Sequence, residues 1–329
     1  MTIKIHSKNS ESIINELHKI MEKFNPQPQL HVQDPLFMSI SVSHPLESEI
    51  DYVYGNQIQY RRFGSTDETQ DAVIMIPGLY ESCSGSVYLF ALLEKYGYRG
   101  YIIELPGYKK FKHSSLGFIQ FCAKKKIQRC HLIGSDLGGY QCLQIASYPY
   151  VNKEIEILSI ILINSYTDIE AVKNQTVSSK IFGKLAAKRV ITKDIERANN
   201  INPNSKSTNF ITKEIKFLNS EDIATRLELM NSHPRTIELC VPNEAVMSIE
   251  TLNHTIPIPE SAIPSVSLEN CRVALLKDGG DWPHIEEPED ACQYILAHLR
   301  KFGNIPKLDQ ILKNTNENQE EEPNISEKK

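Results

Sequence analysis

The stretch Cys130-His131-Leu132-Ile133-Gly134-Ser135-Asp136-Leu137-Gly138-Gly139 decides the fold of this chain. It begins as an apolar run typical of a buried strand, turns at small residues, and continues into a helical segment that extends to about residue 147. Glycines around the turn let the backbone bend sharply and push the central residue to the edge of a sheet. Strand, turn and helix in this order predict a nucleophile elbow.

The central residue of the predicted elbow is Asp136, and two interpretations are open. In some hydrolases an aspartate at this position attacks carbon and forms an ester intermediate. Alternatively, the nucleophile has been lost and Asp136 is tolerated because aspartate accepts a left-handed backbone. The neighbouring Ser135 points away from the site in an elbow, so we assign it no catalytic role.

An elbow supplies backbone amides that stabilise an oxyanion. The amide of Leu137, at the start of the predicted helix, is one expected donor. The second donor normally follows the first parallel strand, which we expect at residues 73–76. The loop after that strand begins Pro77-Gly78-Leu79, so Gly78 and Leu79 occupy the second oxyanion-hole position.

The histidine of this kind of site follows the last strand, commonly in a Gly-Gly-His pattern. Here the segment reads Asp278-Gly279-Gly280-Asp281-Trp282-Pro283-His284, so Asp281 stands where the histidine is expected. Both a serine and an aspartate nucleophile need an imidazole as general base. His284 lies three residues further on and is the alternative base, although Pro283 restricts the loop. The sequence therefore favours a site that has lost its base.

The acidic member of the site has two candidates. We expect a strand at residues 235–241, and Glu244 follows it. Asp168 follows the strand expected at residues 157–163. Without a base to orient, each carboxylate is also readily explained as an ordinary loop acid.

The strand pattern predicts an α/β fold. Alternating apolar and polar residues indicate antiparallel strands at residues 37–42 and 58–63. Continuous apolar runs, which are typical of parallel strands buried on both faces, then follow at residues 73–76, 100–105, 130–133, 157–163, 235–241 and 271–276. Helical segments separate these runs. We therefore expect an α/β-hydrolase fold, with a mostly parallel central sheet flanked by helices.

The domain organisation follows from the same pattern. Residues 1–36 form an N-terminal extension in which an amphipathic helix is expected at residues 10–24. Residues 37–312 form the hydrolase domain, and the strandless segment at about 165–230 is expected to be a helical cap. Residues 313–329 are polar and predict a disordered tail.

Composition narrows the function classes. The chain has 329 residues and a net charge of -5, which argues against nucleic acid as the main partner. Its 7 cysteines include no C-x-x-C pair, so we expect neither a disulfide framework nor a zinc site, and no cofactor. With no secretory signal and no apolar run of membrane-spanning length, we expect a cytoplasmic protein.

Several blocks resemble the maspardin family of divergent α/β-hydrolase-fold proteins. The resemblance extends from about residue 52 to 303, and the blocks that carry it are residues 96–99, 105–108, 130–139, 159–168, 223–227 and 276–283. It implies a cytosolic protein, without established catalysis, that associates with endosomal and trans-Golgi membranes and binds the cytoplasmic tail of a receptor. The family likewise lacks the histidine of the Gly-Gly loop. This chain departs from it in the N-terminal extension and in Asp136, where the family has serine.

Three functions are open at this point. The leading hypothesis is a non-catalytic protein that binds a protein or peptide in the old active-site cleft and reaches membranes only through its partners. The alternative is a hydrolase of epoxides or haloalkanes with Asp136 as nucleophile and His284 as base. A carrier with a small-molecule pocket beneath the cap is the third.

Overall fold

The computed structural model describes residues 35–50, 55–173, 184–232 and 237–304. An eight-stranded sheet with the strand order β1-β2-β4-β3-β5-β6-β7-β8 forms its centre. The strands are β1 (Glu47–Ile50), β2 (Gln57–Phe63), β3 (Ala72–Ile76), β4 (Arg99–Glu104), β5 (Arg129–Ser135), β6 (Glu156–Ile163), β7 (Val246–Thr251) and β8 (Arg272–Leu276). β1 and β2 are antiparallel to their neighbours, and β3 to β8 are mutually parallel. The predicted mostly parallel sheet is therefore confirmed.

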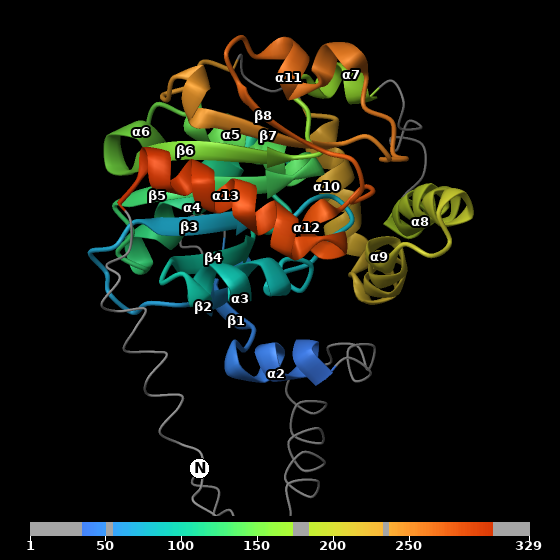
Figure 1. The fold of residues 1–329 in the computed structure, drawn as a ribbon, viewed down its shortest axis with the longest axis horizontal. Coiled ribbons are helices and arrows are strands. Elements are labelled where there is room, and N and C mark those ends of the chain that lie inside the picture. Colours follow the sequence, from blue (N-terminus) through green and yellow to red (C-terminus); the bar gives the residue numbers. More distant parts are fainter. Residues whose placement is uncertain (1–34, 51–54, 174–183, 233–236, 305–329) are drawn as a thin grey trace, which may run out of the picture.

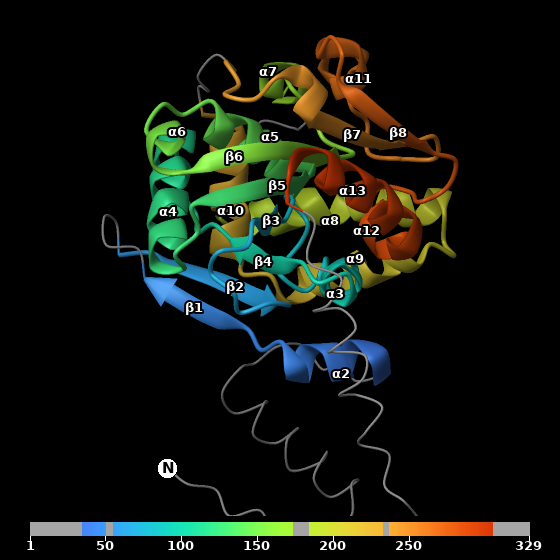
Figure 2. The same cartoon turned by 60° about the vertical axis from the view of Figure 1, so that its left-hand side comes forward.

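Helices cover both faces of this sheet (Figures 1 and 2). On one face, apolar side chains of the strands pack against α3 (Val87–Lys95) and α13 (Pro288–Phe302). On the other face they pack against α4 (Phe111–Lys124), α5 (Asp136–Ala146) and α6 (Val151–Glu154). Because β3 is buried along its whole length, its side chains must be apolar on both faces, as the sequence Ala-Val-Ile-Met-Ile is.

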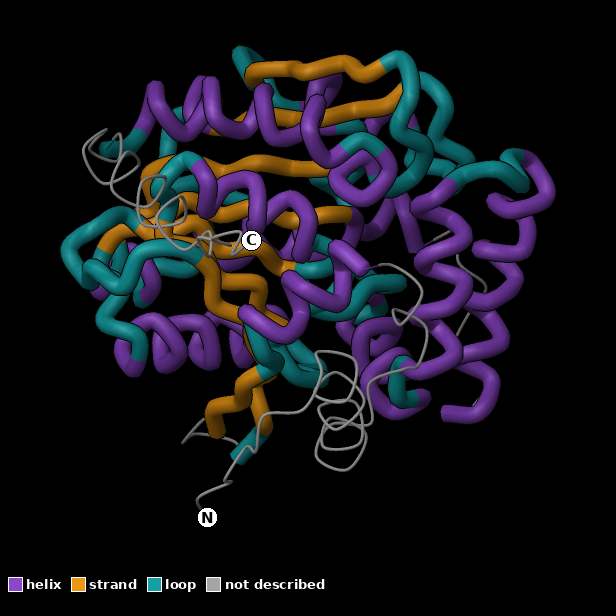
Figure 3. Tube along the Cα trace, turned by 60° about the horizontal axis from the view of Figure 1, so that its bottom comes forward, coloured by secondary structure: helices purple, strands orange, loops and turns teal. Residues whose placement is uncertain are grey.

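The segment between β6 and β7 contains helices rather than strands. They are α7 (Ile169–Lys173), α8 (Lys184–Ile201), α9 (Lys206–Phe217) and α10 (Ser220–Met230). Figure 1 shows α8 and α9 beside the carboxyl ends of the parallel strands, and Figure 3 shows the helices of this region gathered at one side of the sheet. This position puts the segment, which we call the cap, over the end of the sheet where the elbow lies.

The remaining helical elements of the described residues are short turns. They are η3 (Asn243–Ala245), η4 (Glu260–Ala262), α11 (Pro264–Ser267) and α12 (Pro283–Glu286). The described residues include no helix with the length and the apolar composition that a membrane crossing requires.

The structure corrects two of the expected strands. Residues 37–42 lie in a helix, α2 (Pro35–Ser43), whose Ile40 packs against the cluster around α3. Proline is favourable in the first turn of a helix, and the apolar residues of this segment also fit a spacing of three and four. Residues 237–241 are a loop, and the strand that pairs with β6 is β7, at Val246–Thr251. The expected helix at residues 10–24 and the polar tail lie outside the described residues.

Candidate functional site

The elbow lies where β5 ends and α5 begins. Asp136 has a backbone φ of 47°, in the left-handed region that an elbow requires. The turn is possible only because its neighbours lack side chains. A Cβ on Gly134 would lie 2.4 Å from the nitrogen of Gly139, and a Cβ on Gly138 would lie 2.1 Å from the carbonyl oxygen of Ile76. The close approach of β3 to the elbow therefore explains the glycines of the motif.

The carboxylate of Asp136 occupies the place that an oxyanion would take. Its Oδ2 accepts a hydrogen bond from the backbone N–H of Leu79 at 3.0 Å, and the Leu137 amide also donates to it. Burial nevertheless raises the pKa of Asp136 to about 7; the two amides oppose this, and the nearby carboxylates of Glu81 and Asp194 add to it. By surface area the residue is only half-buried, because it borders a cavity. Both predicted amide donors are therefore engaged by the side chain at the elbow itself.

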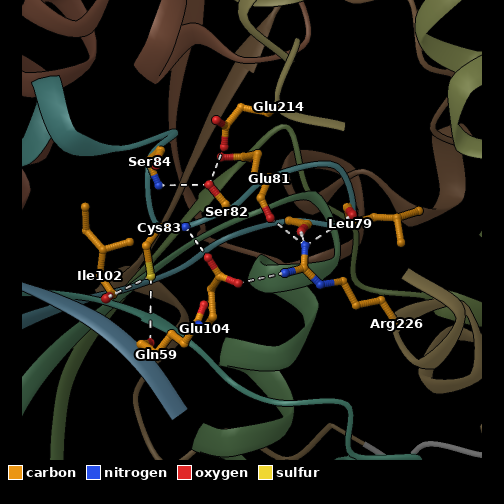
Figure 4. A network of polar contacts seen from close by, with 11 residues as sticks. Gln59, Leu79, Glu81, Ser82, Cys83, Ser84, Ile102, Glu104, Glu214 and Arg226 are labelled. Carbon is orange, nitrogen blue, oxygen red and sulfur yellow. Dashed lines mark hydrogen bonds and ion pairs between the residues drawn. The ribbon is translucent and has the colours of Figure 1, made fainter. Parts of the chain in front are cut away.

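Arg226, on the cap helix α10, holds the loop between β3 and α3, residues 77–86, which carries the Leu79 amide (Figure 4). We call this segment the oxyanion loop. Its guanidinium donates to the carbonyl oxygens of Gly78, at 3.0 Å, of Leu79, at 3.3 Å, and of Glu81. The other end of the guanidinium meets Glu104 Oε2, on β4, at 3.3 Å. One side chain thus fixes the cap, the oxyanion loop and the sheet in a single arrangement.

The residues after Glu81 are bound in the same network (Figure 4). The backbone N–H of Cys83 donates to Glu104, and the hydroxyl of Ser82 donates to Glu214 on the cap helix α9. Burial is the main cause that raises the pKa of Glu104, and the Arg226 charge opposes it. The oxyanion loop is therefore tied to two cap helices by buried polar groups.

Asp281, at the expected histidine position, uses its carboxylate to hold a loop. Its Oδ1 accepts from the backbone N–H groups of Thr255 and Ile256, both at 2.7 Å, and its Oδ2 accepts from the Thr255 hydroxyl at 2.7 Å. The side chain is nearly buried, at 8% exposure. The carboxylate of Asp281 therefore holds the segment after β7 in place.

His284 is also directed away from the elbow carboxylate. It is fully buried on α12, and its Nε2 lies 2.8 Å from Glu81 Oε2. The second carboxylate oxygen of Glu81 accepts a hydrogen bond from the Ser135 hydroxyl. Neither His284 nor Ser135 lines the cavity that Asp136 borders. The three side chains therefore form a buried polar cluster, in which the Nδ1 of His284 has no described partner.

Neither of the two acid candidates lines the cavity that Asp136 borders. Glu244 is an exposed residue of η3 and precedes β7, because the strand expected before it is a loop. Asp168 is exposed and accepts from the backbone N–H of Glu170, at 2.8 Å, which makes it the cap of α7. The structure assigns neither carboxylate a partner in the site.

Sequence reasoning missed two residues that build the site. Asn164, whose φ is 39°, donates from Nδ2 to the carbonyl oxygens of Gly280, at 2.9 Å, and Asp281, at 3.1 Å. The hydroxyl of Ser165 donates to the carbonyl oxygen of Asp136 at 2.7 Å. Their position directly after β6 is the only signal that the sequence offers. This pair joins the elbow to the loop that carries Asp281.

A cavity of about 510 Å³ opens above the elbow. The residues that line it come from the elbow, the cap, and the loops after β3, β6, β7 and β8: Leu79, Tyr80, Asp136, Asn164, Tyr166, Val172, Arg189, Val190, Lys193, Asp194, Arg197, Met230, His254, Ile256, Pro257, Ile258, Asp281 and Trp282. This volume is sufficient for a small ligand or for a few side chains of a bound peptide. Within the described residues no cluster of histidine, cysteine and acidic side chains could hold a metal ion.

His254 is the histidine that lines this cavity. It lies three residues past the end of β7, and its Nδ1 is 2.8 Å from the carbonyl oxygen of Thr251. A carbonyl oxygen only accepts, so Nδ1 carries a proton, and in the neutral imidazole Nε2 is then the nitrogen with the lone pair. The sequence could have indicated this residue only with β7 placed correctly, because residues that follow parallel strands gather at this edge of the sheet.

Comparison with known proteins agrees with this architecture. No family model matches the chain. The chain is 24% identical to maspardin of Danio rerio over 214 residues, which cover 64% of this chain and 68% of that protein. It is 24% identical to maspardin of Homo sapiens over 222 residues, with the same coverage. The chain is a maspardin-like α/β-hydrolase-fold protein.

Solved structures confirm the fold of this maspardin-like chain. A bacterial membrane phospholipase A superposes with a TM-score of 0.60 at 16% identity and covers 89% of this chain and 99% of its own. The enol-lactonase of Burkholderia xenovorans also gives a TM-score of 0.60 at 16% identity, over 77% of this chain and all of the enzyme. At these identities the likeness establishes the α/β-hydrolase fold alone, and the chemistry must be argued from the side chains above.

Proposed function

We propose that this maspardin-like chain is a non-catalytic adaptor that binds a protein or peptide, such as the cytoplasmic tail of a receptor, in the cavity beneath its cap. The proposed place of action is the cytoplasmic side of endosomal and trans-Golgi membranes, which the protein reaches through its partner. The location and the class of partner rest on the resemblance to the maspardin family. The lack of catalysis rests on the side chains of the site.

One observation carries the non-catalytic assignment: Asp281 stands where the histidine base is expected, and its carboxylate accepts hydrogen bonds from Thr255 and Ile256. The oxyanion-hole amide of Leu79 is likewise engaged, by Asp136. A hydrolytic site needs a free base and free amide donors at the same time. What remains is a cavity with apolar walls and several charged groups, which is suited to binding.

Labelling with a fluorophosphonate probe tests the absence of a serine nucleophile. We expect no labelling of the purified full-length chain and no turnover of p-nitrophenyl acetate above the rate in buffer. Labelling that disappears in Ser135→Ala would overturn the assignment, because it would show that the hydroxyl bound to Glu81 is reactive.

Proximity labelling in the native cell tests the binding role. A Val190→Trp variant adds an indole to the cavity wall formed by α8. Ile201→Trp adds the same group at an exposed position of that helix that does not line the cavity. We expect a receptor-type partner that is lost in Val190→Trp and retained in Ile201→Trp. Equal labelling by both variants would contradict binding in the cavity.

A second candidate function is a hydrolase in which Asp136 attacks carbon. It is favoured by one observation, the position of His254 in the same cavity with its Nδ1 bound to the carbonyl oxygen of Thr251, which leaves Nε2 as the nitrogen that could act as base. His284, the base first considered for this reaction, is bound to Glu81 instead. This function requires turnover of epoxides or haloalkanes that is lost in both Asp136→Asn and His254→Ala.

A further inference from the structure

The cavity has a basic wall on one cap helix. Arg189, Lys193 and Arg197 follow one another at intervals of four residues on α8, and all three are exposed and line the cavity. A rise of 1.5 Å per residue places successive members about 6 Å apart along the helix axis. The three cations therefore form a row that extends about 6 Å along the helix on each side of Lys193, which we call the basic row.

Two members of the basic row have no acidic partner among the described residues. Arg197 pairs with Asp194, with 3.6 Å between the guanidinium and Oδ1, and the other carboxylate oxygen of Asp194 accepts from the hydroxyl of Tyr80 at 3.3 Å. No described acidic side chain forms an ion pair with Arg189 or Lys193. Two exposed cations one helical turn apart repel each other slightly, and an anionic ligand would relieve this repulsion.

The other acids of the cavity form no described ion pair with Arg189 or Lys193. The carboxylate of Asp281 accepts its three described hydrogen bonds from N–H and O–H donors of the loop after β7. Asp136 lies at the elbow, and burial raises its pKa to about 7, so it carries less than a full charge at neutral pH. The charges of Arg189 and Lys193 are therefore available to a ligand in the cavity.

A second wall of the cavity is apolar. The loop after β7 contributes Ile256, Pro257 and Ile258, and Trp282 and Tyr166 are almost fully buried beneath it. In an extended peptide, alternate side chains point to opposite sides and repeat every 6.6 to 6.8 Å or so on each side. That repeat is close to the spacing of about 6 Å in the basic row.

From this geometry we infer that the cavity binds an extended peptide in which acidic and apolar side chains alternate. The acidic side chains contact Arg189 and Lys193, and the apolar ones enter the wall formed by Ile256, Pro257 and Ile258. This inference rests on the proposed peptide-binding function and specifies the chemistry of the peptide. A basic peptide would meet like charges at Arg189 and Lys193 and should bind more weakly.

Fluorescence anisotropy with a labelled peptide, Glu-Leu-Glu-Phe-Glu-Leu-Glu, tests the inference against a matched peptide with glutamine in place of each glutamate. The protein is the full-length chain as wild type, Lys193→Gln, the double variant Arg189→Gln/Lys193→Gln, and Lys213→Gln. Lys213 is an exposed cation of the cap helix α9 that does not line the cavity, so it is the matched control. Unchanged circular dichroism and thermal midpoint establish that each variant is folded.

We expect the acidic peptide to bind wild type and the glutamine peptide to bind at least about 10-fold more weakly. Each lost cation should weaken binding by a factor of about 3 to 5, as expected for exposed ion pairs of up to about 1 kcal/mol. The Lys213→Gln control should bind as wild type does, and added salt should weaken binding to wild type more than to the double variant.

Equal binding of the two peptides, or equal weakening by Lys213→Gln, would overturn the inference. Binding of the anionic dye 1-anilinonaphthalene-8-sulfonate in a manner that depends on Lys193, with no binding of either peptide, would assign the cavity to a small anionic ligand and also overturn it. A cellular partner that is lost in Val190→Trp but retained in the double variant would leave the proposed function standing and refute only the acidic chemistry.

Discussion

His284 and Glu81 form a buried hydrogen-bonded pair, with 2.8 Å between Nε2 and Oε2, and neither side chain is exposed. The pair joins α12 to the oxyanion loop across 203 positions of sequence. The second ring nitrogen, Nδ1, has no described partner, but the ring does not line the cavity and so does not face a substrate bound there. The pair therefore has a structural role.

The buried pair predicts a stability effect for His284→Ala. The substitution leaves the Glu81 carboxylate buried without this partner, and breaking such a pair costs about 3 to 5 kcal/mol. Urea denaturation should show this loss in the free energy of unfolding. In the double variant His284→Ala/Glu81→Gln no buried charge remains, so it should be less destabilised than the two single variants combined. Strict additivity would show that the two side chains are not coupled.

Arg226→Gln should destabilise the chain and loosen the oxyanion loop. The substitution removes the guanidinium from three carbonyl oxygens and from Glu104, whose side chain is only 17% exposed. We expect a loss of about 3 kcal/mol in the free energy of unfolding, because one partner of a largely buried pair is left alone. Hydrogen exchange at the Leu79 amide should become faster.

Lys109→Gln is the control for the Arg226 substitution. It breaks the ion pair of Lys109 with Glu228, in which the two side chains are 74% and 53% exposed. Surface pairs of this kind contribute about 0 to 1 kcal/mol. Similar losses in the two variants would mean that burial does not strengthen the Arg226 contacts.

The elbow and the mostly parallel sheet could be predicted from the sequence because they depend on local rules. Gly134 and Gly138 are required by backbone contacts within a few residues of the turn and with the adjacent strand, and fully apolar strands indicate a parallel sheet. The position of β7 could not be predicted in this way. The apolar run that ends at Val241 has the pattern of a strand, yet it is the next segment, Val246–Thr251, that pairs with β6.

The hydrogen-bond partners of the site residues depend on the three-dimensional fold, so they could not be predicted from local sequence patterns. The substitution of histidine by Asp281 is visible in the sequence, but its contacts with Thr255 and Ile256 arise only when the loops after β7 and β8 meet. The same holds for His254. Because the strand was expected at residues 235–241, the sequence did not indicate that His254 follows β7. Which residue stands at a position is thus readable from sequence, and what it contacts is not.

Asp281→Ala should release the loop after β7. The substitution removes three hydrogen bonds of 2.7 Å to Thr255 and Ile256. Hydrogen bonds to a charged group contribute about 1.5 to 3 kcal/mol each, and relaxation of the loop and access of water offset part of this, so we expect a loss of roughly 2 to 3 kcal/mol. Asp281→Asn keeps one acceptor and should lose less. An Asp281→Ala variant as stable as wild type would contradict the anchoring role.

The raised pKa of Asp136 predicts a stability profile that depends on pH. The folded-state pKa is about 7, against an ordinary value of 3.8. Between these two values the folded chain holds a proton that the unfolded chain releases, so the contribution of Asp136 to stability falls as pH rises from about 4 to about 7 and then stays level. Asp136→Asn removes this titration and also tolerates the left-handed backbone.

The free-energy difference between Asp136→Asn and wild type should therefore grow in favour of the variant from pH 4 to pH 7. A shift of about three pKa units limits the change in this free-energy difference to about 4 kcal/mol. Because Asp136 is open to the cavity on one side, solvent screening should reduce the change to roughly 1 to 3 kcal/mol. Urea denaturation at intervals of pH measures the difference, and a ¹³C titration of the Asp136 carboxyl should have its midpoint near 7. A difference that is constant across this range would show that the elbow carboxylate is ionised in the folded protein throughout, and the cavity floor would then carry a full negative charge.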